Sequence, residues 1–359
     1  MSIRSLPSRR ALLALAIGLS SNGCAAPDAA VATDPARPDP AGIFRFEPLD
    51  DGVWAALVLP RPEAWAFANS LVVIGDDGVL VVDTQQSPTA ARALVERIRE
   101  WTDLPVRWVV NTHWHGDHHY GNVAYRDAWP DARFLAHPAT VDGMRSEGAA
   151  QREAEMGRLP GSIADAERWL EAGALPDGRV VEGELREGLE YSLRLRRSYL
   201  EELRTLEFVE PEPWVSEIRR IDVGGRVVEL HPLGPAHTGG DVVVRIPDAG
   251  IAAVGDLLES TALPWIDGMA SATGWAAALD ALAELDDRIH LPAHGEIDRG
   301  GALLAMERAV FRDAVSGEGE GLDRHRPFFT RVGADDEAAR RWWEAVREAA
   351  SGRPGGYPR

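Results

Sequence analysis

Short hydrophobic runs alternate with polar turns in the N-terminal half of the chain. Two runs, Leu71–Ile74 and Val79–Val82, flank a polar four-residue stretch that contains two glycines. This spacing predicts a β-hairpin with a tight turn. Over Pro88–Trp101, apolar residues recur every three or four positions, which predicts a helix, and the run Val106–Val110 predicts another strand.

Three further hydrophobic runs lie in the C-terminal half and predict strands: Val242–Ile246, Ile251–Val254 and Ile289–Leu291. Strands that alternate with helices are typical of α/β proteins, which tend to place their chemistry in polar loops at strand ends. The pattern therefore predicts an α/β fold with its functional residues at the ends of strands.

The segment of about 141–218 lies between these two groups of strands. Its leucines recur at helical spacing among many arginines and glutamates, which predicts inserted helices. These helices either pack on the body of the protein or form a wall of the substrate groove, to which they would supply Trp169, Tyr191, Tyr199 or Trp214. The segment 316–359 predicts a C-terminal helical extension.

The N-terminus has the pattern of an export signal. Arg9 and Arg10 precede the apolar run Ala11–Leu19, which is far shorter than the roughly 20 residues that span a bilayer. Residues 1–26 are therefore expected to be an export signal, either of the twin-arginine type or an ordinary secretory one. The expected location is the periplasm, and the mature chain is expected to have no transmembrane helix.

Cys24, the only cysteine, follows that apolar run. Its position resembles the acylated cysteine of bacterial lipoproteins, although Ser21 stands where those signals usually carry leucine. A lipid anchor at Cys24 would make the protein a membrane-anchored lipoprotein; the alternative is cleavage after Ala26 or Ala32. Residues 27–42, which are rich in Ala, Pro and Asp, predict a linker.

Composition narrows the classes of partner. The chain has 359 residues, of which 45% are hydrophobic, enough for a folded core. Its formal net charge of −19 argues against nucleic acid as a partner and leaves a small-molecule substrate as the expected one.

The stretch "THWHGDHHYG" gathers four histidines and an aspartate within seven positions. His113 and His115 are two residues apart, and Asp117 adjoins His118, so a loop is expected to bring them together. Such a loop could present two histidines to one ion and the Asp/His pair to a second ion. Imidazole and carboxylate ligands without thiolate favour zinc, with iron or manganese as alternatives. The competing interpretation is a histidine-rich surface loop.

Three further candidate ligands stand beside predicted strands: His237, Asp256 and His294. Together with the HxHxDH motif, they make the sequence resemble the metallo-β-lactamase fold superfamily over roughly residues 44–310. The resemblance implies an αββα sandwich with a helical insertion, here over about 43–315, and a metal groove at one edge.

The resemblance also implies how the ligands are shared. His113, His115 and His237 would hold the first of two Zn²⁺ ions per chain. Asp117, His118 and His294 would hold the second, and Asp256 would bridge both ions. Asp83 would support the ligand loop by hydrogen bonds, although a turn-capping aspartate is the alternative. Outside this set, His119 is expected to be a solvated or hydrogen-bonded loop residue, and His137 and His290 are expected to be structural.

The implied chemistry is attack of a metal-bound hydroxide on an amide, ester or lactone carbonyl, with Asp117 as the catalytic carboxylate. A zinc β-lactamase is one alternative. Glu259 weakens it, because some such enzymes carry a lysine there to bind the drug's carboxylate, whereas Ser260 and export favour it. The other alternative is a metal-binding lipoprotein without turnover.

Overall fold

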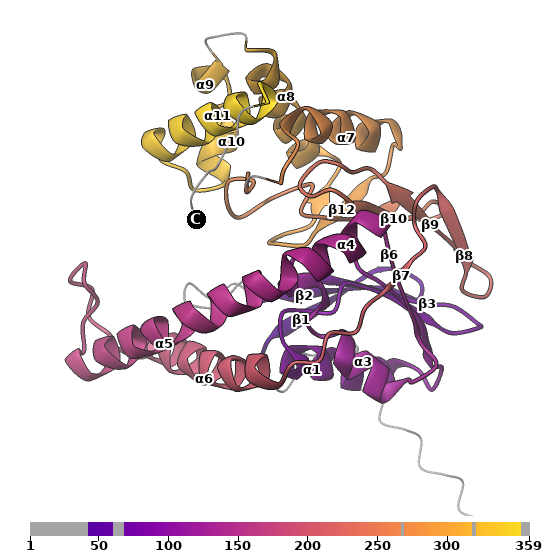
Figure 1. Ribbon diagram of the computed structural model, residues 1–359, viewed down its shortest axis with the longest axis horizontal. Coiled ribbons are helices and arrows are strands. Elements are labelled where there is room, and N and C mark those ends of the chain that lie inside the picture. The colour runs from indigo at the N-terminus through magenta and orange to yellow at the C-terminus, as the bar shows by residue number, and fades with distance from the viewer. Residues whose placement is uncertain (1–41, 60–67, 267–268, 318–320, 353–359) are drawn as a thin grey trace, which may run out of the picture. The chain divides into compact units, whose positions relative to one another are not determined.

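The computed structural model describes residues 42–59, 68–266, 269–317 and 321–352, so the export signal and Cys24 lie outside the described residues. Thirteen strands within these ranges form two sheets (Figure 1). The first sheet has the order β1 (Phe44–Asp50), β2 (Val53–Val58), β3 (Ser70–Ile74), β4 (Val79–Val82), β5 (Val106–Val110), β6 (Arg133–Ala136) and β7 (Glu212–Pro213). The second has the order β13 (Asp298–Arg299), β12 (Ile289–Pro292), β11 (Ile251–Gly255), β10 (Val242–Ile246), β9 (Val227–Pro232) and β8 (Arg219–Asp222).

Both sheets are mixed. β1 to β4 pair antiparallel, whereas β4 to β7 pair parallel. In the second sheet, β11 and β12 are parallel and the other pairs are antiparallel. Because β4 and β5 are parallel, their C-terminal ends lie side by side, and the same holds for β11 and β12. The residues that follow these four strands include most of the candidate metal ligands.

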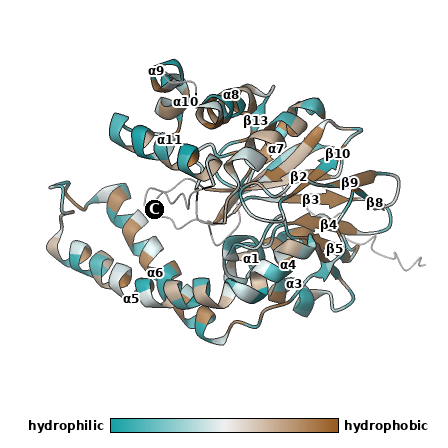
Figure 2. Ribbon diagram, turned by 45° about the horizontal axis from the view of Figure 1, so that its top comes forward, coloured by the Kyte–Doolittle hydropathy of each residue, from teal (hydrophilic) through white to brown (hydrophobic). Residues whose placement is uncertain are grey.

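The helices lie outside the sheets, and the strands between them are predominantly hydrophobic (Figure 2). Those associated with the first sheet are α1 (Pro88–Trp101), α2 (Gly116–His119), α3 (Asn122–Ala128), α4 (Pro138–Ser146), α5 (Gly148–Ala172) and α6 (Gly183–Thr205). The helices that follow β11 in the chain are α7 (Ala272–Glu284), α8 (Ala302–Ser316), α9 (Gly321–Arg324), α10 (Arg326–Arg331) and α11 (Asp336–Ala350).

Side-chain alternation explains the layers. In β3, Leu71 and Val73 face the core between the sheets, while Val72 faces α1 and α3. In β10, Val242 and Val244 face the same inter-sheet core. Val243 packs on the opposite side, with α7, α8, α10 and α11. Successive side chains of a strand point to opposite faces of the sheet, and here both faces are covered, one by the other sheet and one by helices. The αββα sandwich expected from the sequence is therefore confirmed.

The segment after β6 is helical. α5 and α6 lie side by side as an antiparallel pair (Figure 1), and a buried hydrogen bond from the Tyr199 hydroxyl to Glu155 joins them. Ser87 caps α1 by accepting a hydrogen bond from Ala90 N, which fixes the start of the predicted helix 88–101. Among the helices that the structure describes, none combines the length and the apolar character needed to cross a membrane.

Candidate metal centre

Seven side chains named from the sequence meet at the ends of strands from both sheets. His113 and His115 follow β5, His237 precedes β10, Asp256 follows β11 and His294 follows β12. Asp117 and His118 lie on α2, so the expectation of a loop at this point is wrong. One helical turn of four residues is too short to leave a periodic pattern in the sequence, but it directs these two neighbouring side chains toward the same site.

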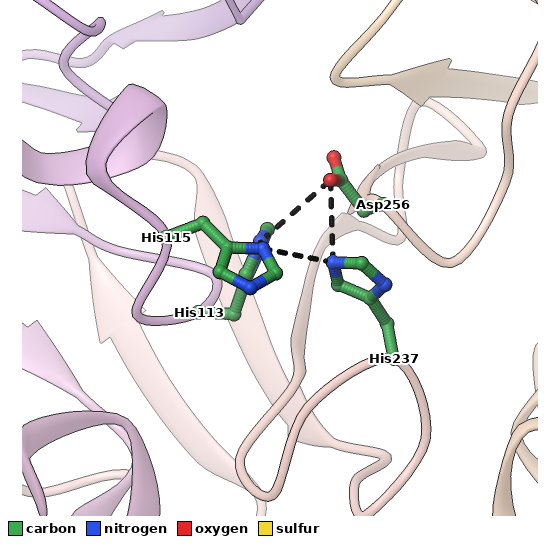
Figure 3. Close-up of side chains that lie close together, drawn as sticks. All are labelled: His113, His115, His237 and Asp256. Atoms are coloured by element: carbon green, nitrogen blue, oxygen red, sulfur yellow. Dashed lines mark hydrogen bonds and ion pairs between the residues drawn. The ribbon is translucent and has the colours of Figure 1, made fainter. Parts of the chain in front are cut away.

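The first cluster consists of His113, His115, His237 and Asp256 (Figure 3). His115 Nδ1 lies 3.0 Å from His113 Nε2 and 3.0 Å from His237 Nε2. Asp256 Oδ2 lies 3.7 Å from His113 Nε2 and 3.4 Å from His237 Nε2. Three imidazole nitrogens and a carboxylate oxygen therefore converge on one point.

The second cluster consists of Asp117, His118 and His294. Asp117 Oδ2 lies 3.3 Å from His294 Nε2 and 3.7 Å from His118 Nε2. The other oxygen of Asp256, Oδ1, lies 3.4 Å from His118 Nε2 and 3.5 Å from His294 Nε2. The two oxygens of Asp256 thus face different clusters, which is the arrangement that a bridging carboxylate requires.

The distances fit a metal ion better than a hydrogen-bond network. A tetrahedral zinc ion with ligands at 2.0–2.1 Å holds them ~3.3 Å apart, close to the separations above. A ring nitrogen has one lone pair or one hydrogen, so His115 Nδ1 cannot hydrogen-bond fully to both of its neighbours. His118 Nε2 and Asp256 Oδ1 are buried and face each other at 3.4 Å, but neither makes a hydrogen bond of good geometry. Buried polar atoms without partners are rare, and a cation would satisfy both.

Burial and neighbouring charges divide the histidines into two kinds. Burial, assisted by neighbouring imidazoles, lowers the pKa of His113 and His115 well below the usual value, so their rings are neutral. Burial also opposes charge on His118 and His294, but the surrounding carboxylates outweigh it. They raise the pKa of His118 well above its usual value and that of His294 to about 9.

The two site carboxylates are held in the anionic form. Burial opposes this, but His118 and His294 outweigh it and lower the pKa of both Asp117 and Asp256. Neutral imidazoles in one cluster and anionic oxygens in both make a donor set suited to divalent cations.

Asp83 lies behind the second cluster. Asp83 Oδ2 is 2.8 Å from His118 Nδ1 and accepts a hydrogen bond from Thr112 Oγ1 at 2.8 Å. Asp83 Oδ1 accepts a hydrogen bond from Thr112 N, also at 2.8 Å. A carboxylate on the distal nitrogen of a ligand histidine fixes the tautomer and the ring orientation. These contacts are the ones that the predicted supporting role needs.

Sequence reasoning missed the equivalent support of the first cluster. Asp241 is buried and accepts hydrogen bonds from Ala236 N, Thr238 N and Thr238 Oγ1, which closes the turn that carries His237. The spacing of a Thr and an Asp around two glycines, directly before a strand, is the signal that could have identified it. Trp265 was also missed; its ring centroid lies 5.1 Å from that of His115.

The remaining histidines lie outside both clusters. His119 is buried rather than solvated, so that part of the expectation is wrong; its ring packs edge-on against Tyr120 at 4.9 Å, and burial lowers its pKa to about 3. His137 caps α4 by accepting a hydrogen bond from Ala139 N. His290 is buried, with Nδ1 3.6 Å from Asp298 Oδ2.

The aromatic residues of the insertion make contacts away from the ligands. Tyr199 packs under α2 in a small hydrophobic cluster, and the Tyr191 hydroxyl donates to Gly42 O. Trp214 stacks with the guanidinium groups of Arg133 and Arg219. These contacts favour scaffolding over a direct role in lining the groove.

Known proteins support the same assignment. Residues 64–294 match the model of the metallo-beta-lactamase superfamily. A curated relative, the linear primary-alkylsulfatase of Pseudomonas sp. (strain ATCC 19151), is 22% identical over 251 residues, which are 67% of this chain and 44% of the relative. The chain thus spans less than half the length of that relative.

Solved structures share the fold. A metallo-beta-lactamase from Pontibacter korlensis has a TM-score of 0.52 at 16% identity and covers 75% of this chain and 99% of its own. The metallo-beta-lactamase FIM-1 from Pseudomonas aeruginosa, in its mono-zinc form, has a TM-score of 0.50 at 20% identity, over 76% of this chain and 96% of its own. By its motif, its fold and the family match, the chain belongs to the metallo-β-lactamase superfamily.

Proposed function

We propose that the protein is a dinuclear zinc hydrolase. The observation that carries this proposal is the placement of Asp256, whose Oδ2 faces His113 and His237 while its Oδ1 faces His118 and His294. Two adjacent cation sites that share a carboxylate are typical of enzymes that hydrolyse esters, amides and phosphates. His113, His115 and His237 would hold one ion, and Asp117, His118 and His294 would hold the other.

Zinc in these sites supplies Lewis acidity and lowers the pKa of coordinated water to about 7. The chain itself contributes Asp117, whose pKa is lowered by His118 and His294 despite burial; a bound cation in place of the charge on these histidines would act in the same direction. This carboxylate would accept a hydrogen bond from an attacking water molecule and so orient it. Asp83 holds the His118 ring by its Nδ1, which keeps Nε2 directed into the site.

We propose an amide, ester or lactone as the substrate class. A sulfate ester is a second candidate, favoured by the similarity to the alkylsulfatase. Glu259 disfavours β-lactams among the amides. It follows Asp256 by three residues, its pKa is raised by burial, and His294 and Asp256 lie close enough to act on its charge. A carboxyl group at this position offers no positive charge to bind the carboxylate that those drugs carry.

The alternative without catalysis is a metal-storing protein. Asp117 argues against it, because storage does not require a carboxylate beside the exposed side of the site. The test combines metal analysis of the purified protein with a panel of β-lactams, lactones, esters, thioesters and alkyl sulfates. We expect about two zinc ions per chain and turnover of at least one class. Protein loaded with two ions that hydrolyses none of them would favour storage.

We further propose that the chain is exported and anchored by a lipid on Cys24. The support is the pattern of the first 26 residues, in which Arg9 and Arg10 precede a short apolar run. Cys24→Ser should then release a soluble form from the membrane fraction. Wild-type protein found wholly in the soluble periplasm would exclude the anchor.

A further inference from the structure

The start of α2 is capped by a residue from the helical insertion. Gln151 Oε1 on α5 accepts a hydrogen bond from Gly116 N, the first residue of α2, at 3.0 Å. The first N–H groups of a helix have no partner within the helix, and a side chain at the preceding position usually supplies one. Here that position is His115, whose side chain makes no capping hydrogen bond because its Nδ1 points into the first cluster. An N-cap side chain accepts from the second or third N–H of a helix, so the contact of Gln151 with Gly116 N is a separate anchor for the start of α2.

The end of α2 also packs on the insertion. Tyr120, which terminates α2, is 1% exposed and lies in a hydrophobic cluster with Leu159 of α5, Tyr199 and Leu203 of α6, and Leu206, which directly follows α6. Its ring also fills the space where a side chain on Gly116 would stand, since an added Cβ would lie 2.3 Å from Tyr120. Both ends of this single turn are therefore fixed by contacts with α5 and α6.

A buried polar contact braces the two inserted helices at this place. The Tyr199 hydroxyl of α6 donates to Glu155 Oε2 of α5, and both side chains are buried. Burying a carboxylate is costly unless it is hydrogen-bonded, so this contact favours one relative placement of α5 and α6. One turn further along, α6 is tied to α1, because Glu202 Oε1 accepts from Thr89 Oγ1 at 2.6 Å and from Arg92 at 2.9 Å.

We propose that the insertion positions α2, and through it Asp117 and His118, so that it sets the affinity of the second cluster for its ion. Gln151 is a positioning residue here, and Glu155 and Tyr199 brace it. The first cluster depends on α2 only through His115, its N-cap, because His113 lies further upstream and His237 and Asp256 come from the other sheet. This inference rests on the proposed dinuclear site and deepens it.

The test compares zinc affinity in Gln151→Ala and Gln151→Glu, measured on metal-free protein by competition with a chromogenic chelator. The alanine variant lacks the acceptor and should bind the second ion roughly 10- to 100-fold more weakly, the usual effect of losing a group that orients ligands. The first ion should bind as in wild type. The glutamate variant keeps an acceptor oxygen and should restore the second affinity. Glu153→Ala, an exposed position on α5, is the matched control.

A His294→Ala background identifies which ion is affected: adding Gln151→Ala there should not weaken the remaining ion. Unchanged affinities in Gln151→Ala, equal weakening of both ions, or failure of the glutamate to restore binding would each overturn the proposal. If Gln151→Ala does not fold, Tyr199→Phe takes its place; selective weakening of the second ion supports the proposal, and lower thermal stability with both affinities intact overturns it. Because no substrate is used, a protein without hydrolytic activity would refute the proposed function while leaving this result standing.

Discussion

The two clusters differ in charge, in exposure and in what they can do. The first is built mainly of neutral imidazoles, and the side chains of His113 and His237 are 1% and 3% exposed. The second combines Asp117 with two histidines of raised pKa; the side chains of His294 and Asp117 are 15% and 11% exposed, whereas His118 is fully buried. A closed set of imidazoles is suited to holding an ion. The second set, which includes the Asp117 carboxylate, is the side from which a substrate and a water molecule would enter.

Asp256→Ala should weaken metal binding in both clusters at once. Because its two oxygens face different clusters, its removal takes a ligand from both ions at once. We expect fewer than two zinc ions per chain and a fall in hydrolytic rate of more than about 10⁴-fold, beyond the usual loss of a general base. Metal analysis and steady-state kinetics test this. Retention of both ions with wild-type affinity would show that Asp256 does not bridge them.

Asp117→Asn separates binding from catalysis within the second cluster. Asparagine keeps the size and one oxygen of the side chain but is not a base. The rate should fall by about 10² to 10⁴-fold, with the second ion retained in part. Rates and metal content measured on the same sample distinguish the two effects. A variant that loses zinc in proportion to its rate would assign Asp117 to metal binding alone.

The strands and the ligand motif were predictable because both leave a local signature. The hydrophobic runs of β4, β5 and β10 have the bounds expected from the sequence, because strands covered on both faces leave nearly continuous apolar runs. The seven named side chains do lie together, because five of them stand beside strand ends and Asp117 and His118 lie on the short helix that follows β5. The α2 turn was not predictable, since four residues carry no helical period. Gln151 was not predictable either, because it meets Gly116 from a separate helix 35 residues away.

Asp83 and Asp241, which support the second and the first cluster, should have smaller effects on zinc affinity than the ligands themselves. Asp83→Asn keeps an oxygen for Thr112 N but places an amide nitrogen against His118 Nδ1. It should weaken the second ion by roughly 10- to 100-fold. Asp241→Asn disturbs the turn that carries His237 and should weaken the first ion instead. Zinc competition titrations of both variants test whether each one weakens a different ion. If both variants weaken the same ion, the two clusters are not supported independently.

The smallest effect is expected beyond both clusters, at Glu307 on α8. This side chain is fully buried, and its Oε2 accepts from Glu259 N in the segment after Asp256. Burial raises its pKa well above the usual value. The unfolded chain therefore releases this proton at lower pH than the folded chain, and ionisation disfavours folding as pH rises above the unfolded pKa of about 4.3.

Glu307→Gln keeps an acceptor for Glu259 N and removes the ionisation. The variant should be more stable than wild type by about 1–3 kcal/mol at pH 8, with a higher melting temperature, and the gain should shrink toward pH 4, where Glu307 is protonated in both states. Thermal unfolding of both proteins between pH 4 and pH 8 measures this. Zinc affinity of both clusters should not change, because the hydrogen bond to the segment after Asp256 is retained. A difference in melting temperature between the two proteins that does not change with pH would contradict a buried, neutral carboxyl at Glu307. Weaker binding of the second ion in the variant would mean that Glu307 helps to support the metal centre.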